Sequence, residues 1–161
     1  MMKKILLSTI CCMIMFTGTV MVCSAQIAPE RVALGGIQVG ATMGYVKSIY
    51  GEPSWSESSF DRMFGQTLTT HHYGETLSIV YTENGRVNDI RSTGNNGFAT
   101  PDGVRVGMNV GVLQKVYGQS DDVVNSSNTR FYAMQGAPYV GIRFDFKGGK
   151  ITQIWVADFG W

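Results

Sequence analysis

The chain contains one phrase twice, and this repeat constrains its fold more than any other feature. The first copy, GIQVGATMGYVKSIYGE, begins at Gly36, and the second, GVRVGMNVGVLQKVYGQ, begins at Gly103. The identical pairs, all at the same offset, are Gly36/Gly103, Val39/Val106, Gly40/Gly107, Gly44/Gly111, Tyr50/Tyr117 and Gly51/Gly118. A repeat of this kind predicts two similar units that must pack together to bury a common core.

Each copy predicts a short, capped helix. Thr42 and Asn109 are suited to the N-cap because a short side-chain oxygen can accept a hydrogen bond from the first turn. Gly51 and Gly118 stand where a left-handed C-terminal cap is needed. Apolar residues recur between them at helical spacing: Met43, Val46, Ile49 and Tyr50, then Val110, Leu113, Val116 and Tyr117. Helices of about two turns are unstable alone and need a packing partner.

Two segments predict the β-hairpins against which these helices pack. Leu77, Ile79 and Tyr81 alternate ahead of an ENG turn, and a similar run that ends in Phe144 and Phe146 precedes KGG. Weaker strand patterns are PSWSES, QTLTTHHY, DVVN and TRFYAM. We therefore expect an α+β fold in which two tandem helix-plus-antiparallel-strand repeats form a joined sheet, with the helices packed on one face.

The N-terminal segment predicts export. Lys3 and Lys4 precede an apolar run, and small residues close that run in VCSAQ, so residues 1–25 are expected to be a signal peptide cut after Ala25. A retained membrane anchor is the alternative, since the run is long enough to cross a bilayer. Lipidation of Cys23 is disfavoured because Val22, rather than a small residue, precedes it. The expected location is the periplasm or the medium.

The rest of the chain divides into a first repeat at 34–93, a linker at 94–102 and a second repeat at 103–158. Removal of the signal peptide takes away Lys3 and Lys4, so the 13 basic side chains become 11 against 12 acidic ones, and the net charge becomes −1. No basic surface is expected to bind nucleic acid. All three cysteines lie in the predicted signal peptide, so neither a disulfide nor a cysteine metal site is expected in the exported protein, and stable membrane insertion after cleavage is not expected either.

The last strand of each repeat predicts the residues that face away from the core. Val87 and Ile90 are three apart, as are Ile151 and Ile154, which breaks strict alternation twice and predicts a β-bulge or a change of face. If the isoleucines face the core, their neighbours face the open side of the sheet. Aromatic and arginine side chains are the usual anchors of protein interfaces. The predicted partner-binding residues are Trp155, Trp55, Tyr73, Phe64, Arg91, Arg143 and His71.

The pattern VG-x-[TN]-x₃-[VL]-x₂-[VI]-YG, followed by an apolar strand, a glycine turn and G-[RK]-[VI]-x-x-I, resembles the SmpA/OmlA group, which includes BamE. The tandem arrangement resembles the β-lactamase inhibitory proteins (BLIP-like). The resemblance covers roughly Leu34 to Ala157 and implies two α/β repeats side by side, with a concave open face that grips another protein. The chain departs from the inhibitors in having no cysteine after the signal peptide, and from BamE in having two repeats and a poor lipidation motif.

The residues of HHYGE do not predict a metal site. A zinc ion needs three or four ligands, and the adjacent His71 and His72 point to opposite sides of a strand. Neither a metal nor a cofactor is therefore expected. One of the two histidines is expected at the surface and the other partly packed.

No motif indicates catalysis: GxSxG is absent, and most of the acidic residues fall in predicted turns. We therefore expect an exported, non-enzymatic protein-binding module, either inhibitor-like or envelope-assembly-like, whose partner is another extracytoplasmic protein. The alternative is a small secreted hydrolase or a ligand-binding domain. The aromatic terminus WVADFGW leaves a small outer-membrane barrel as a less favoured alternative. A barrel would require nearly every exported residue in long alternating strands.

Overall fold

The computed structural model describes residues 26–62, 65–120 and 127–160. The predicted signal peptide, Phe64 and the strand expected at DVVN lie outside the described residues.

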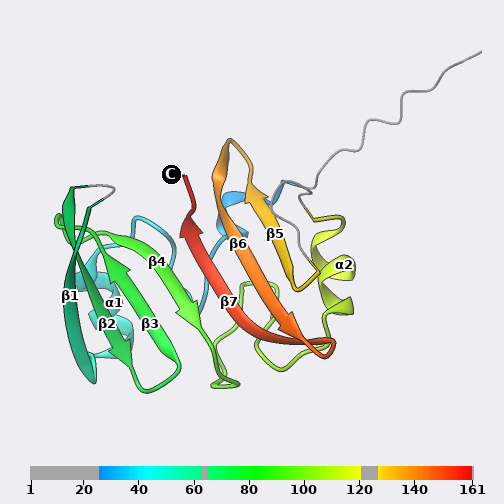
Figure 1. The fold of residues 1–161 in the computed structure, drawn as a ribbon, viewed down its shortest axis with the longest axis horizontal. Coiled ribbons are helices and arrows are strands. Elements are labelled where there is room, and N and C mark those ends of the chain that lie inside the picture. The colour runs from blue at the N-terminus through cyan, green and yellow to red at the C-terminus, as the bar shows by residue number, and fades with distance from the viewer. Residues whose placement is uncertain (1–25, 63–64, 121–126, 161) are drawn as a thin grey trace, which may run out of the picture.

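The described chain forms one seven-stranded sheet in the order β1-β2-β3-β4-β7-β6-β5, and every neighbouring pair is antiparallel (Figure 1). The strands are β1 (Trp55–Asp61), β2 (Gln66–Tyr73), β3 (Leu77–Tyr81), β4 (Val87–Ser92), β5 (Thr129–Met134), β6 (Ala137–Lys147) and β7 (Lys150–Asp158). The helical elements are η1 (Pro29–Arg31), α1 (Met43–Tyr50) and α2 (Gly111–Tyr117).

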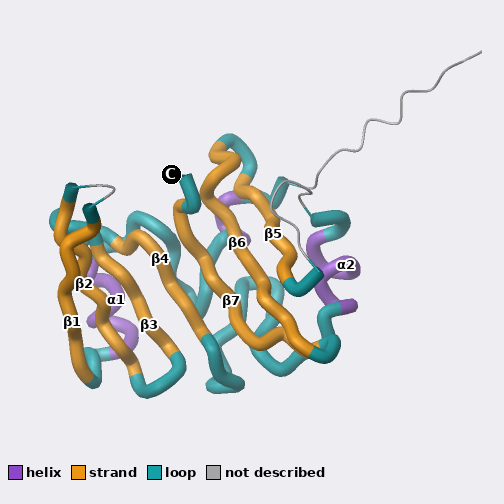
Figure 2. Tube along the Cα trace, viewed as in Figure 1, coloured by secondary structure: helices purple, strands orange, loops and turns teal. Residues whose placement is uncertain are grey.

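The predicted α+β class is wrong, because the protein is mainly β. The two α-helices hold only 8 and 7 residues, whereas the seven strands make up most of the regular secondary structure of the described chain (Figure 2). The weak strand patterns around Trp55, Thr69 and Phe131 became complete strands, since pairing with a stronger neighbour supplies backbone hydrogen bonds that local propensity does not reveal. The two short helices therefore cover one face of a continuous sheet and do not form a second layer of comparable size.

The helix ends follow the repeated motif with one difference. Thr42 caps α1, and its Oγ1 accepts a hydrogen bond from the Tyr45 backbone N–H at 3.1 Å. Gly51 and Gly118 end the two helices with φ of 75° and 77°, which glycine adopts readily. Asn109 does not cap α2 in the same way: its Oδ1 accepts from the Gly111 N–H, and α2 begins at that glycine. The second helix is one residue shorter as a result.

The broken alternation is explained by two bulges at equivalent places. In β4, Asn88 is the extra residue between the pairs Tyr81–Val87 and Val80–Asp89. In β7, Thr152 is the extra residue between the pairs Phe146–Ile151 and Asp145–Gln153. Each bulge restores the alternation that the three-residue spacing broke, so Ile90 and Ile154 face the core and are fully buried.

The core lies between one face of the sheet and a cover made of α1, α2 and the loops that carry the repeated motif. From the sheet come Leu77, Ile79, Tyr81, Ile90, Tyr132, Ile142, Phe144, Ile151, Ile154 and Val156, and from the cover come Val32, Leu34, Ile37, Val46, Val104, Val106, Leu113 and Tyr117. The Tyr117 ring lies 5.0 Å from Tyr132 and 5.6 Å from Phe144, between ring centroids. We call the other side of the sheet the open face.

The middle of the sheet has approximate two-fold symmetry. β4 pairs with β7, the corresponding strand of the second half, and Arg91 lies opposite Trp155, its own equivalent in that half. The hairpins β2-β3 and β5-β6 flank this pair on either side. The position at which the two halves meet is therefore also one at which their sequences differ.

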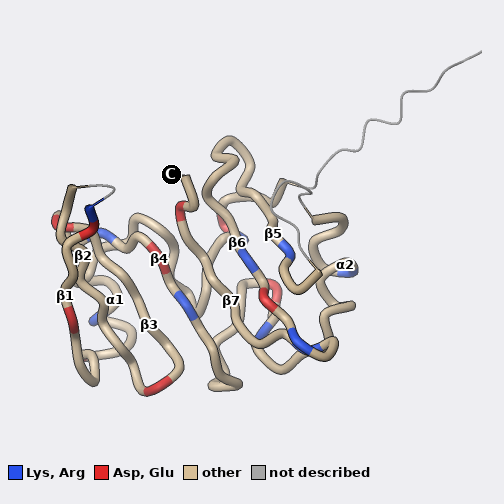
Figure 3. The backbone as a smooth tube through the Cα atoms, in the orientation of Figure 1, with Lys and Arg blue, Asp and Glu red and all other residues tan. Residues whose placement is uncertain are grey.

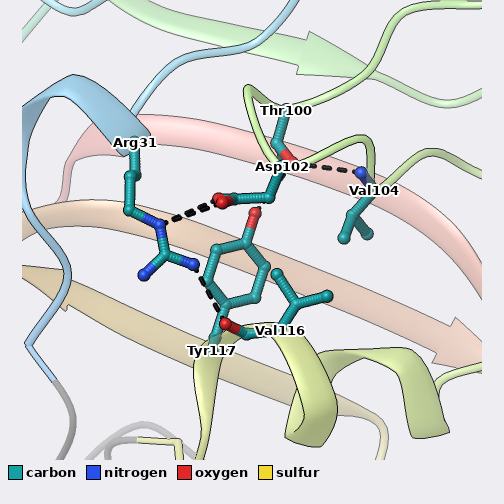
Figure 4. Close-up of polar contacts among 6 residues, drawn as sticks. All are labelled: Arg31, Thr100, Asp102, Val104, Val116 and Tyr117. Carbon is teal, nitrogen blue, oxygen red and sulfur yellow. Dashed lines mark hydrogen bonds and ion pairs between the residues drawn. The ribbon is translucent and has the colours of Figure 1, made fainter.

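The predicted linker at 94–102 is tied to its surroundings (Figure 4). Arg31 Nε donates to both carboxylate oxygens of Asp102, at 3.0 and 3.1 Å, and its Nη2 donates to the Val116 carbonyl at 3.0 Å. Thr100 is buried, and its Oγ1 lies 2.7 Å from the Tyr117 hydroxyl. This cluster joins η1, the linker and the C-terminal end of α2, so it holds the second helix against the sheet.

We expect Asp102→Asn to lower the free energy of unfolding by about 1–2 kcal/mol, because charge-assisted hydrogen bonds to a half-buried arginine are lost. Urea denaturation is the measurement. Glu52→Gln is the control, since the Lys47–Glu52 pair is exposed at the end of a single helix and its loss should cost less than about 0.5 kcal/mol. Equal effects of the two substitutions would contradict a special role for the Asp102 cluster.

Candidate functional site

The open face carries one row of side chains that crosses all seven strands. Neighbouring strands pair so that each member lies directly opposite the next. From β1 to β5 the members are Trp55, His72, Ser78, Arg91, Trp155, Arg143 and Phe131, and we call this the cross-strand row. With strands about 4.8 Å apart, the row is about 29 Å long. Four of the seven predicted partner-binding residues belong to it.

The β1 end of the row is a stacked pair. The Trp55 and His72 rings are parallel within 4°, with centroids 3.6 Å apart, and Trp55 is 51% exposed. His72 Nε2 also lies 3.2 Å from Glu57 Oε1, one row further along the same face. The stack fixes the orientation of a large exposed indole, which reduces the side-chain entropy that a partner contact would otherwise cost.

The centre of the row is an indole between two guanidinium groups. Arg91 lies over the Trp155 ring with 4.1 Å between Cζ and the ring centroid, and Arg143 lies 5.4 Å from the same centroid. Cation–π contacts of this kind hold arginine side chains without neutralising them. Figure 3 shows basic residues, in blue, on both β4 and β6.

The two arginines differ in their partners. Arg143 Nε donates to Asp145 Oδ1 at 2.9 Å, and Asp145 also accepts from Gln153 and Thr129, so its carboxylate is well satisfied. Arg91 makes no hydrogen bond or ion pair within the described part of the chain, and its Nε is buried without a partner. The Arg91 guanidinium thus keeps its capacity to bind an anionic group.

The β5 end of the row is covered by the chain's own C-terminal residues. The Phe159 ring meets Phe131 edge-on at 5.3 Å and Trp155 at 5.0 Å. Phe131 lies across Gly141 so closely that a Cβ there would come within 2.8 Å of the ring. Phe131 is buried, whereas Trp155 and Arg143 are only half-buried. The accessible part of the row therefore runs from Trp55 to Arg143.

A buried carboxylate lies beside the centre of the row. Asp89 is only 8% exposed because it sits between Val80 on β3 and Ala157 on β7. Desolvation by burial raises its pKa to about 6, and the nearby Arg91 guanidinium and Trp155 indole N–H oppose that rise in part. Asp89 Oδ1 and Trp155 Nε1 are nonetheless both buried without a well-formed hydrogen bond.

Two predicted contact residues lie on the other side of the sheet. Tyr73 is opposite Leu77 and packs against Tyr50 with ring centroids 5.5 Å apart. His71 is opposite Ile79, is 6% exposed and packs against Tyr81; its burial lowers the pKa of the imidazole. Strand parity, which places His71 on this side and His72 on the open face, could be fixed only by the register with β3. The remaining predicted partner-binding residue, Phe64, lies outside the described residues.

Sequence reasoning did not include Asp89, Asp145, Phe131 or Phe159 among the predicted partner-binding residues. Asp89 and Asp145 are each two residues from a predicted arginine on the same strand, so period-two alternation was the signal available for them. Nothing in the sequence indicated that Phe159 folds back onto Phe131 and Trp155.

Other kinds of site are poorly represented in the part of the chain that the structure describes. It holds no group of three or more His, Cys, Asp or Glu side chains placed to bind a metal ion. None of its helices combines the length and apolar character needed to cross a membrane. A shallow, largely apolar cleft of about 260 Å³ lies away from the row, lined by Pro29, Val32, Gln38, Val39, Met134 and Val140.

The chain matches no protein-family model, and no curated protein and no solved structure is significantly similar to it. The resemblance to the SmpA/OmlA group and to the β-lactamase inhibitory proteins therefore stays an expectation drawn from the repeated motif.

The raised pKa of Asp89 predicts a specific pH dependence of the free energy of unfolding. Its folded-state pKa is raised above the usual value, so the folded protein holds this proton more tightly than the unfolded chain, and stability should fall as pH rises from about 4 to about 6. Asp89→Asn should remove this loss. Relative to wild type, the variant should gain on the order of 2 kcal/mol between pH 4 and pH 7 in urea denaturation. Glu75→Gln, which removes an exposed carboxylate, is the control. A stability difference between wild type and Asp89→Asn that stays constant with pH would refute the assignment.

Proposed function

We propose that this protein is an exported binding module whose open face engages another extracytoplasmic protein. The observation that carries the proposal is the cross-strand row, because it brings Trp55, Arg91, Trp155 and Arg143 from four strands into one line on the face that α1 and α2 leave uncovered. Tryptophan and arginine dominate the energetics of protein interfaces. An inhibitor or an envelope-assembly factor, the roles that the sequence resemblance implies, would use such a face.

The row also suggests what its partner presents. The Arg91 guanidinium stacks on an indole and forms no ion pair within the described chain. A carboxylate from the partner, flanked by an apolar group that covers Trp155, would satisfy the guanidinium and bury the ring together. The stacked Trp55 lies three strands from Arg91, about 14 Å away, and would form a second anchor.

The rigidity of the row supports this role. Arg143 is held by a hydrogen bond to Asp145, which also accepts hydrogen bonds from Gln153 and Thr129. Trp155 is held between Phe159 on one side and Arg91 on the other. A surface ordered before binding loses less conformational entropy when the partner docks.

We expect Arg91→Gln and Trp155→Ala each to weaken partner binding by at least about tenfold, because central anchors carry most of the binding energy. The exported protein would be used to capture its partner from envelope and secreted fractions, and the affinity for that partner would then be measured by calorimetry. Tyr45→Ala is the matched control, since this aromatic is 50% exposed on α1, on the covered side of the sheet.

Unchanged affinity in both row variants would overturn the proposal. If Trp155→Ala lost affinity and thermal stability together while Arg91→Gln kept full affinity, Trp155 would be a packing residue and the interface would lie elsewhere. Turnover of a substrate by the exported protein, with no protein captured, would favour the hydrolase alternative.

A further inference from the structure

The two edges of the sheet are protected to different extents. At the β5 edge, Ile27 pairs alongside Met134: the Ile27 N–H donates to the Ala133 carbonyl, the Gln135 N–H donates to the Ile27 carbonyl, and both distances are 2.8 Å. At the β1 edge, no strand of the described chain lies beyond β1 (Figure 1). Six of the seven residues of β1 are exposed.

β1 has few of the features that usually keep an edge strand from pairing, and its charged residues are Glu57 and Asp61. It contains no proline and no lysine, and it stays in register with β2 over its whole length without a bulge. It also exposes two large apolar side chains, Trp55 at 51% and Phe60 at 63%, on its two faces. A regular, exposed edge of this kind is a template for another strand.

We propose that β1 pairs antiparallel with β1 of a second copy of this chain, about a two-fold axis through Ser58, so that the two sheets join edge to edge. The axis is perpendicular to the sheet, so the open faces of the two copies lie on the same side. Backbone hydrogen bonds between the edges would supply the pairing, and the side chains would fix its register.

The charges of β1 select the register. With Ser58 on the axis, Trp55 lies opposite Asp61 of the second copy and Glu57 lies opposite Ser59, so no like charges lie directly opposite each other. The neighbouring symmetric registers are worse: an axis at Glu57 places the two Glu57 side chains opposite each other, and an axis at Ser59 places Glu57 opposite Asp61. Like charges directly opposite in a sheet are destabilising. Only the Ser58 register pairs every residue of β1 and avoids them.

The sizes of the side chains agree with the same register. On the covered side of the sheet, Phe60 lies opposite Ser56 of the second copy and next to its Ser58. Two small side chains leave room for an aromatic ring that is 63% exposed in the single chain. The pairing therefore buries Phe60 twice, once in each copy, and the burial of apolar surface adds to the hydrogen bonds.

The first experiment measures the dissociation constant of the dimer by sedimentation velocity, on protein purified from the exported fraction. Ser59→Glu places a carboxylate opposite Glu57 of the second copy, twice per dimer, and should weaken the dimer about tenfold. Ser59→Lys, a substitution at the same exposed site with the opposite charge, should strengthen it, and high salt should narrow the difference. A wild-type protein that stays monomeric across the concentration series, or equal constants for the two variants, would overturn the proposal.

The second experiment tests the register. The exported chain is expected to hold no cysteine, so a single Ser58→Cys substitution places one thiol from each copy at the axis, within disulfide range. It should cross-link rapidly under mild oxidation. Ser56→Cys is the matched control: its two thiols would lie about 13 Å apart and should remain reduced. Equal cross-linking of the two variants would refute the register. Both readouts are independent of the partner proposed for the open face, so failure of one proposal does not affect the other.

Discussion

The pairing of β4 with β7 is the interaction on which the rest of this structure depends. It joins the two halves of the chain into one sheet, and its register sets which side of every strand faces the core. A slip of one residue would place Ile90 of β4 and Val156 of β7 on opposite faces, so that the apolar residues of one of the two strands would face solvent. The two bulges, at Asn88 and Thr152, make the correct register possible because they convert a three-residue apolar spacing into a common buried face.

Helices and loops cover only one face of the sheet. This explains where the core lies and why side chains on the other face pack against one another. Helices of 8 and 7 residues, with the motif loops and the tied linker, are enough to cover one side. The other side is left with its own side chains, which pack laterally: the Arg91–Trp155 and Trp55–His72 stacks and the Arg143–Asp145 pair are all contacts between neighbours on the open face. Lateral packing is dense enough to bury Asp89 and raise its pKa, yet the Arg91 guanidinium forms no hydrogen bond or ion pair within the described chain.

The sequence predicted individual strands and helices better than it predicted the proportion of helix to strand. Alternation in Leu77–Tyr81 and in the segment around Ile142 located strands and core, and the spacing of Ile90 and Ile154 located the irregularities that proved to be bulges. The fold class was wrong because strand patterns such as QTLTTHHY are weak until a neighbouring strand pairs with them. The sequence did not show that Tyr73 and His71 lie on the covered side, for a related reason: in a strand of mixed polarity, which parity faces the core is decided by the neighbour, here Leu77 and Ile79 of β3.

The sequence by itself determined the repeated helix caps at Gly51 and Gly118, the hairpins, and the outward direction of Arg91 and Trp155, because each follows from local conformation or from period-two alternation. Only the tertiary structure decided that Trp55, His72, Arg91, Trp155 and Arg143 form one row, since strands far apart in the chain must first be ordered and placed in register. It also decided that Asp89 is buried and that β1 lies at an edge of the sheet. These properties depend on which strands become neighbours, and no short stretch of sequence encodes that.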